Sequence, residues 1–347
     1  MRIGSPLRLL LLCAACACAA AEPAPPANLE GEQYPYPVQT FGFKSQSQSF
    51  GMAYMDVPAP GHPEHTVVLL HGAEFCGSLW RGIIPALHRA SARVIAVDQL
   101  GTCKSSKPVN YQYSFQQRAS NTSQLLASLN VGPIVLVGHS FGGMLAMRYA
   151  LMFPSQVQRL VLIDPLGLED WKAEGAGYLP IDQRYALLLQ TRAADIRRYD
   201  TENYLGGHWN PVLDPWVQML AGMYQGTGSE RFAWNQALIE DMMFTQPVLY
   251  ELNRLRAPTL IVVGARDRAA PFRRTAPKDI GERMGDYPLL ARRAAEHIPS
   301  ARTVVLEDVG HLPPLEAPQR VAELLLQNLE LAAPESPRPA NPAPPGH

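Results

Sequence analysis

Short apolar runs alternate along this chain with longer amphipathic stretches. Runs of strand-like length lie at residues 67–70, 94–97, 134–137, 160–163, 259–263 and 303–306. Apolar side chains recur at helical spacing in residues 79–90, 115–129, 143–152 and 317–331. Alternation of buried strands with amphipathic helices is typical of a mostly parallel sheet with helices on both faces. The pattern therefore predicts an α/β fold with a twisted, mostly parallel sheet.

Other segments depart from this alternation. Residues 36–44 and 49–57 have mixed polarity and predict an antiparallel strand pair at one edge of the sheet. Residues 165–258 lack the strand and helix rhythm and are rich in aromatic and methionine side chains, some at helical spacing, such as Trp216 and Met223. We expect a helical insertion here, whose large side chains mostly pack it onto the rest of the protein and line a mostly apolar pocket.

The composition fits one large α/β unit. The chain has 347 residues, of which 47% are hydrophobic and 18% charged, so it can bury a large core and is unlike a disordered protein. The formal net charge is −1, and the sequence has no long basic run. A nucleic-acid partner is not expected, because binding of that kind depends on a basic surface.

The N-terminus has the features of an export signal. Arg2 and Arg8 precede an apolar stretch that ends in small residues just before Glu22. The apolar stretch is shorter than the ~20 residues that a membrane-spanning helix needs. We therefore expect residues 1–21 to be a cleaved signal peptide and the mature protein to be periplasmic or secreted, with no stable membrane span.

Cysteines within the same segment leave an alternative open. Cleavage before Cys16 or Cys18 would give a lipid-anchored lipoprotein instead. We expect residues 22–34 to be a linker and residues 332–347 to be a disordered Pro-rich tail. Segments of this composition bury too little apolar surface to offset the entropy cost of ordering them. The sequence does not indicate an oligomeric state.

A serine stands where a predicted strand turns into a predicted helix. Gly138-His139-Ser140-Phe141-Gly142 follows a strand-like apolar run and precedes a helix-like stretch. A serine in such a turn has a strained backbone that exposes its hydroxyl, and the flanking glycines keep the chain from clashing at the bend. The helix also directs free N–H groups at the place where an oxyanion would form. We predict that Ser140 is a nucleophile.

A serine nucleophile needs a base and a carboxylate that holds the base in the right tautomer. His311 lies on a predicted loop after the last strand-like run, a position suited to the base. Asp267 turns out of another such run and is our candidate for the carboxylate. Asp164, which also ends a strand-like run, is the alternative. The order Ser140, Asp267, His311 is the chain order of the nucleophile-elbow hydrolases.

These motifs resemble the α/β-hydrolase superfamily, and within it the capped bacterial serine hydrolases with esterase-like triads. The resemblance covers about residues 35–331. It implies that residues 35–164 and 259–331 form the hydrolase core, and that residues 165–258 form a helical cap over the nucleophile.

The resemblance also implies an oxyanion hole. Its donors would be the backbone N–H groups of Phe141 and of Ala73, which follows the His71-Gly72 pair after the first strand-like run. For Glu74, the next residue, we expect a solvated loop carboxylate, and a pocket position that tunes a base or binds a cation is the alternative.

Two cysteines remain after removal of the signal peptide. The family's fold places the loops that carry Cys76 and Cys103 at the ends of adjacent strands near the active site. In an oxidising compartment these two could form a disulfide, and two buried free thiols are the alternative.

The expected activity is hydrolysis of a small or medium, mostly uncharged carboxylic ester, without a metal or cofactor. No cysteine and histidine spacing suggests zinc. The same triad also supports amide, lactone or carbon–carbon bond hydrolysis and perhydrolysis. The alternative from another functional class is a non-catalytic module that binds a ligand.

Overall fold

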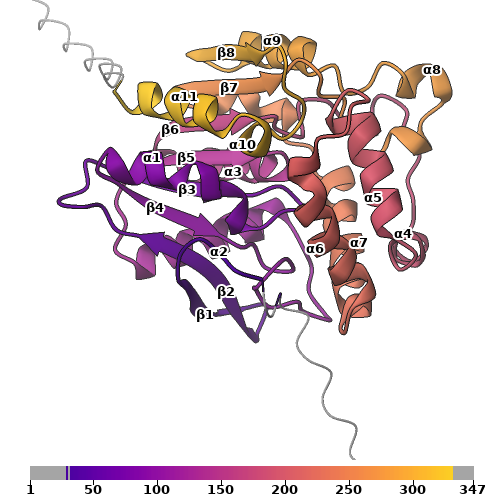
Figure 1. The fold of residues 1–347 in the computed structure, drawn as a ribbon, viewed down its shortest axis with the longest axis horizontal. Coiled ribbons are helices and arrows are strands. Elements are labelled where there is room, and N and C mark those ends of the chain that lie inside the picture. The colour runs from indigo at the N-terminus through magenta and orange to yellow at the C-terminus, as the bar shows by residue number, and fades with distance from the viewer. Residues whose placement is uncertain (1–28, 30–31, 331–347) are drawn as a thin grey trace, which may run out of the picture.

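Figure 1 shows a computed structural model of the chain, which describes Leu29 and residues 32–330. The expected signal peptide at residues 1–21 and the expected tail at residues 332–347 lie outside the described residues. Within the described part of the chain, no helix is both long enough and apolar enough to cross a bilayer.

An eight-stranded sheet forms the centre of the described structure. Its strands are β1 Val38–Ser45, β2 Gln48–Val57, β3 His65–Leu70, β4 Ala92–Val97, β5 Ile134–His139, β6 Val157–Ile163, β7 Thr259–Gly264 and β8 Ala301–Leu306. Their spatial order is β1-β2-β4-β3-β5-β6-β7-β8. β2 is antiparallel to both of its neighbours, and the other pairs are parallel. The mostly parallel sheet with an antiparallel edge is therefore confirmed.

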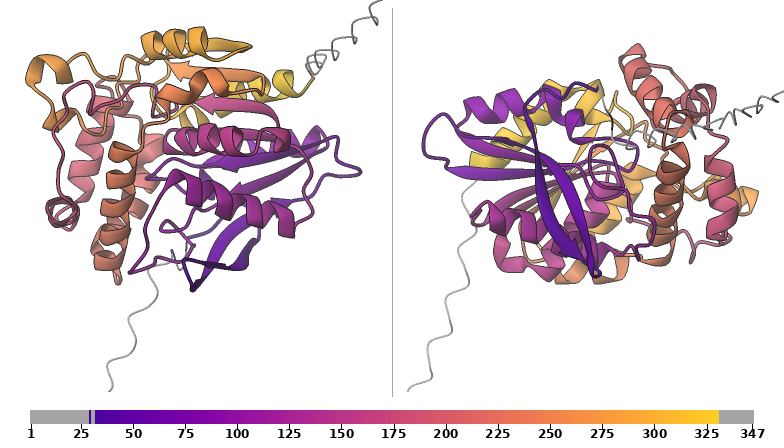
Figure 2. Two further views of the ribbon diagram at one scale, coloured as in Figure 1. Left: turned by 180° about the vertical axis from the view of Figure 1, so that it is seen from behind. Right: turned by 90° about the horizontal axis from the view of Figure 1, so that it is seen from below.

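Helices cover both faces of this sheet. The α-helices of the described residues are α1 Ile84–Arg89, α2 Phe115–Ser128, α3 Phe141–Met152, α4 Ile181–Leu188, α5 Ala193–Tyr199, α6 Asp214–Gln225, α7 Ser229–Thr245, α8 Lys278–Gly281, α9 Tyr287–His297, α10 Pro313–Glu316 and α11 Pro318–Glu330, and those outside the segment between β6 and β7 pack around the sheet. α1 packs with α11 on one face, and α2 packs with α3 on the other (Figures 1 and 2). Because both faces are covered, the central strands are continuous apolar runs.

The segment between β6 and β7 contains helices and no strand. Helices α4 to α7, and a π-helical turn η3 (Asp200–Tyr204) between α5 and α6, stand beside the edge of the sheet at which the parallel strands end (Figure 1, right). Many of its large side chains pack it in place: the Trp171 ring lies 4.9 Å from the Phe272 ring, and the Trp216 ring 5.4 Å from that of Phe75. This insertion forms a wall over the carboxyl ends of the strands.

One predicted helix is divided in the structure. The sequence predicts a single helix over residues 79–90, whereas the chain forms a 3-10 turn at Gly77–Gly82 and then α1. Pro85 lies in the first turn of α1, where its missing N–H costs nothing, while inside one continuous helix it would remove a hydrogen bond.

Candidate active site

Ser140 lies at the turn between β5 and α3. Its φ of 55° and ψ of −122° are outside the regions that L-residues usually adopt. A Cβ on Gly138 would collide with the backbone of Gly142, and a Cβ on Gly142 would collide with the carbonyls of Leu70 and His71. Glycine is therefore required at both positions for the turn to close and expose the serine hydroxyl.

The structure brings the three predicted triad side chains into one hydrogen-bonded line. His311 Nε2 lies 2.9 Å from Ser140 Oγ, and His311 Nδ1 lies 2.6 Å from Asp267 Oδ2. All three side chains are buried. Burial lowers the pKa of His311 to about 3, so its imidazole is neutral at neutral pH. With Nδ1–H donating to the carboxylate, Nε2 presents its lone pair to the serine hydroxyl.

The alternative carboxyl group, Asp164, lies next to Asp267. Its Oδ1 accepts the Gly264 N–H at 2.9 Å, and the side chain is also hydrogen-bonded to the Asp267 carboxyl. Two carboxyl groups can share a hydrogen bond only when one holds a proton. Burial, and then the charge of Asp267, raise the pKa of Asp164 well above its usual range. Burial also raises the pKa of Asp267, but its bond to Asp164 lowers it. The proton therefore belongs to Asp164, and Asp267 is the carboxylate that faces the imidazole.

The residues predicted to form the oxyanion hole, Ala73 and Phe141, both lie near the nucleophile. Phe141 is the first residue of α3, and Ala73 lies in the loop after β3 on the wall of the same cavity as the serine. Neither N–H donates a hydrogen bond within the described residues. His71 holds this loop, because its Nε2 accepts the Gln99 N–H at 3.1 Å and its Nδ1 lies 2.6 Å from the Gly72 oxygen. The two free donors are available to an oxyanion.

Contacts from two directions hold the loop of His311. Glu316 accepts the N–H groups of Gly310 and Leu312, on either side of the histidine, at 3.1 Å each. Tyr204, from η3 in the helical insertion, accepts the His311 N–H with its backbone oxygen at 2.8 Å. Its ring centre lies 4.4 Å from that of the imidazole. The helical insertion therefore helps to orient the base.

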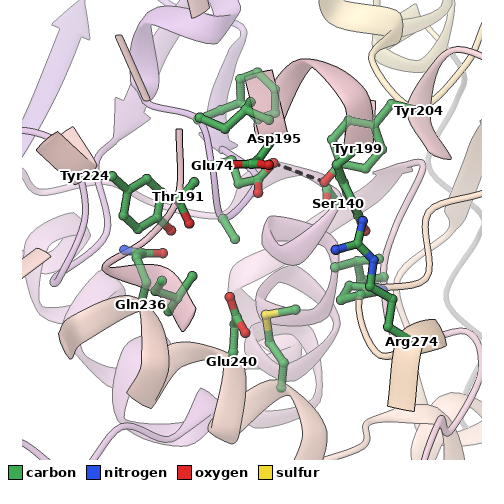
Figure 3. Close-up of a pocket in the computed structure, with 17 residues that line it drawn as sticks. Glu74, Ser140, Thr191, Asp195, Tyr199, Tyr204, Tyr224, Gln236, Glu240 and Arg274 are labelled. Carbon is green, nitrogen blue, oxygen red and sulfur yellow. Dashed lines mark hydrogen bonds between the residues drawn. The ribbon is translucent and has the colours of Figure 1, made fainter. Parts of the chain in front are cut away.

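A cavity of about 250 Å³ lies over Ser140 (Figure 3). The sequence predicts a mostly apolar pocket, but four charged side chains line the cavity: Glu74, Asp195, Glu240 and Arg274. The expectation of a solvated Glu74 is wrong, because the loop after β3 turns its carboxyl inward, where it accepts the Tyr204 hydroxyl at 3.2 Å.

Cys76 and Cys103 form a disulfide in the structure, with their Cα atoms 5.7 Å apart. Of the two alternatives that the sequence leaves open, the structure has the disulfide. It ties the loop that carries Ala73 to the loop after β4. One end of the oxyanion loop is thereby fixed covalently.

Two buried groups within the described residues have the spacing of metal ligands. One consists of His71, Asp98 and Cys103, and the other of Asp164 with the triad acid and base. In the first group the sulfur is in a disulfide and Asp98 accepts the Gly77 N–H at 2.6 Å. The second group is joined by the hydrogen bonds described above. A metal ion would have to displace these contacts, so neither group is suited to hold one.

Comparison with known proteins identifies the family. Residues 65–318 match the family model described as the alpha/beta hydrolase fold. The chain belongs to the α/β-hydrolase family.

Several proteins similar to this α/β hydrolase are named as hydrolases. A 2-hydroxy-6-oxo-2,4-heptadienoate hydrolase from Pseudomonas putida is 34% identical over 214 residues, which cover 59% of this chain and 73% of that protein. The crystal structure of a probable hydrolytic enzyme from Pseudomonas aeruginosa is 50% identical, covers 89% of this chain and 99% of its own, and superposes with a TM-score of 0.86. An esterase from Thermogutta terrifontis shares the fold, with 22% identity, coverage of 84% and 100%, and a TM-score of 0.64. The protein is therefore an enzyme of the hydrolase type.

Sequence reasoning missed several residues of this α/β-hydrolase site. Glu316 and Tyr204 carry no local motif, because each acts through contacts with the loop of His311 from a distant part of the chain. For Glu74, the position next to the predicted oxyanion turn was the available signal, and a solvated carboxylate was the expectation drawn from it. The insertion, which the sequence shows to be rich in aromatic and methionine side chains, contributes Tyr199, Tyr204, Tyr224 and Met243 to the cavity wall.

Proposed function

We propose that this α/β hydrolase cleaves small or medium carboxylic esters by two-step acyl transfer. The observation that carries the proposal is the continuous line from Ser140 Oγ through the His311 imidazole to the Asp267 carboxylate, with spacings of 2.9 and 2.6 Å. This arrangement is the geometry by which a neutral imidazole activates a serine. A cavity of about 250 Å³ at the serine suits a small acyl group or alcohol.

In the first step, His311 Nε2 takes the proton from Ser140 as Oγ attacks the ester carbonyl. The N–H groups of Ala73 and Phe141 hold the oxyanion of the tetrahedral intermediate. The imidazolium, held by Asp267, then gives its proton to the departing alcohol. In the second step, His311 takes a proton from water, which attacks the carbonyl of the acyl-enzyme and releases the acid. The net reaction converts ester and water into acid and alcohol.

The test of this function compares the wild-type enzyme with Ser140→Ala on p-nitrophenyl butyrate. We expect wild-type turnover and a loss of at least about 100-fold in kcat for the variant, because the acyl-enzyme cannot form. A fluorophosphonate probe should label one equivalent of wild-type protein and none of the variant. Equal rates for the two proteins, or labelling elsewhere, would refute the proposal.

Carbon–carbon bond hydrolysis is the second candidate. The Pseudomonas putida relative, 34% identical over 214 residues, is named as a hydrolase of a 2-hydroxy-6-oxo dienoate. The same serine, base and oxyanion donors act on a ketone in that chemistry. Measuring kcat/KM on a dienoate of this kind and on the butyrate ester distinguishes the two functions. The substrate with the higher kcat/KM indicates which function the enzyme has.

We also propose that the enzyme acts outside the cytoplasm. The Cys76–Cys103 disulfide supports this, because structural disulfides form in oxidising compartments. Cell fractionation followed by mass measurement of the purified mature protein tests the proposal. A chain that begins at Glu22 fits a cleaved signal peptide, a lipidated cysteine fits an anchored lipoprotein, and an intact N-terminus in the cytoplasmic fraction contradicts export.

A further inference from the structure

The loops that carry Asp267 and His311 are joined by backbone only where they begin. Arg266, just before the acid, donates its N–H to the Val309 oxygen at 3.0 Å, and within the described residues no later backbone hydrogen bond links the two loops. Beyond this point the acid and the base meet through their side chains. The alignment of the two therefore depends on what else holds each loop.

Two successive backbone oxygens of η3 each accept an N–H from one of these loops. The Asn203 oxygen accepts the N–H of Arg268, the residue after the triad acid, at 2.8 Å. The Tyr204 oxygen accepts the N–H of His311, also at 2.8 Å. Both oxygens are at the end of η3, where the carbonyl groups of a helix have no partner within it. One turn of the helical insertion thus spans the loops of the acid and the base.

The loop of His311 has a glycine at the place where η3 approaches it. A Cβ on Gly310 would lie 1.8 Å from the Tyr204 oxygen, so any larger residue would push η3 away. The form of the turn is also informative, because π-helical turns are rare and are frequently found at functional sites. The close approach of η3 to the base is therefore built into both segments.

Arg273 fastens η3 to the loop of the acid. Its guanidinium donates to the side-chain oxygen of Asn203 and, at 2.7 Å, to the backbone oxygen of Arg268. It also donates to the backbone oxygens of Gly281 and Met284, at 2.9 and 2.7 Å. A guanidinium has its donors in a rigid planar fork, so four acceptors hold it in one orientation. The arginine is a fixed point to which η3 is bound.

Asn203 links this fixed point to the insertion. Its Nδ2 donates to the Tyr199 oxygen at 2.9 Å, while its Oδ1 faces Arg273. The side chain is buried and is not among the residues that line the cavity at Ser140. It can therefore affect the triad without contact with a substrate.

We propose that η3 holds the loops of Asp267 and His311 in register, and that Asn203 and Arg273 are positioning residues of the triad. The inference rests on the proposed function, because it names residues that keep the same acid and base aligned. A misplacement of about 1 Å in a catalytic arrangement costs about 100-fold in rate, so a contact of this kind has a measurable effect.

Asn203→Ala tests the inference by removing the oxygen that Arg273 bonds. We expect kcat on p-nitrophenyl butyrate to fall by about tenfold or more, and KM to change much less, since the substrate cavity keeps its lining. Asn210→Ala is the matched control: this half-buried asparagine of the same insertion accepts the Val212 N–H at 3.1 Å, and its loss should leave kcat unchanged. Thermal unfolding of each variant gives the folded fraction, and kcat is expressed per folded enzyme.

A double-mutant cycle assigns the effect to the contact between the two side chains. Arg273→Ala should also lower kcat, and adding Asn203→Ala to it should lower kcat little further, because the contact is already lost. Losses that multiply in the double variant would show that the two residues act independently, and would overturn the inference.

The proton between His311 Nδ1 and Asp267 gives a readout that a merely structural role would not change. Its NMR resonance, downfield of the amide protons, should shift or broaden in Asn203→Ala and stay in place in Asn210→Ala. A fall in kcat with an unchanged resonance overturns the inference, because the lost activity would not come from the alignment of acid and base.

Gly310→Ala perturbs the same contact from the other side and replaces Asn203→Ala if that variant does not fold. The new Cβ should push η3 away, lower kcat and shift the same resonance. Wild-type kcat in either folded variant overturns the inference and leaves the esterase in place. Absence of wild-type turnover, with no fluorophosphonate labelling of Ser140, refutes the proposed function, and the resonance then still tests the alignment.

Discussion

Replacing Asp267 by asparagine tests which of two neighbouring carboxyl groups serves His311. Asp267 Oδ1 accepts the Ala269 N–H at 2.7 Å, and Oδ2 faces His311 Nδ1 at 2.6 Å. In Asp267→Asn the amide oxygen stays with the Ala269 N–H, because an NH₂ group there would face another donor. The NH₂ then faces Nδ1 and selects the tautomer with hydrogen on Nε2, which cannot accept the Ser140 proton. A wrong tautomer of this kind costs about 10⁴-fold in kcat.

Asp164→Asn is the matched substitution, and we expect it to cost less than about tenfold. Asp164 Oδ1 accepts the Gly264 N–H at 2.9 Å, so the amide oxygen keeps this place. The NH₂ group then faces Asp267, as the protonated carboxyl does in the wild type. The donor to Asp267 is preserved, and the carboxylate that faces the imidazole is untouched.

The assay is kcat/KM on p-nitrophenyl butyrate at neutral pH, with thermal unfolding of each variant to show that it is folded. We expect a difference of about 10³-fold or more between the two asparagine variants. A folded Asp164→Asn variant that loses as much activity as Asp267→Asn would show that the pair acts as a unit. A reversed order would make Asp164 the triad acid.

Three further outcomes follow from single contacts. Gly142→Ala should lower kcat by at least about 100-fold, measured with the same ester, because the new Cβ collides with backbone carbonyls of the loop after β3 and displaces the oxyanion donors. Reduction of the Cys76–Cys103 disulfide, which spans 27 residues, should lower the unfolding free energy by about 3.5 kcal/mol in denaturant titrations, and Cys76→Ser should not respond to reductant. Burial raises the pKa of Glu74 to about 7, so the wild-type enzyme loses stability as the pH rises through that value. Glu74→Gln should therefore be more stable than the wild type above pH 7, and no more stable well below it. The difference should be about 1–2 kcal/mol by denaturant titration, and its absence would show a solvated Glu74.

The sheet and the nucleophile turn were predictable because their signals are local. A buried parallel strand requires a continuous apolar run, and the turn that ends β5 requires glycine at Gly138 and Gly142 for steric reasons alone. The loops after β7 and β8 place Asp267 and His311 at the same edge of the sheet as Ser140, since the carboxyl ends of parallel strands meet there. Chain order and strand ends were therefore sufficient to predict that Ser140, His311 and an aspartate meet at this edge.

The choice between the two aspartates was not predictable from the sequence. Asp164 and Asp267 each follow a buried strand, and β6 and β7 are neighbours, so both carboxyl groups reach the same region. Each accepts a backbone N–H, and what distinguishes them is which side chain meets His311 Nδ1. That depends on the paths of two loops, and composition or periodicity carries no information about those paths.

The charged side chains of the cavity wall were also not predictable from the sequence, because their positions depend on the paths of several loops. Glu74 comes from the loop after β3 and Tyr204 from η3, and neither element predicts the other. Tyr204 connects Glu74 with His311: its backbone and ring hold His311, and its hydroxyl donates to Glu74. Glu74 and His311 are therefore connected through one residue of the insertion, and neither segment carries that connection in its own residue pattern.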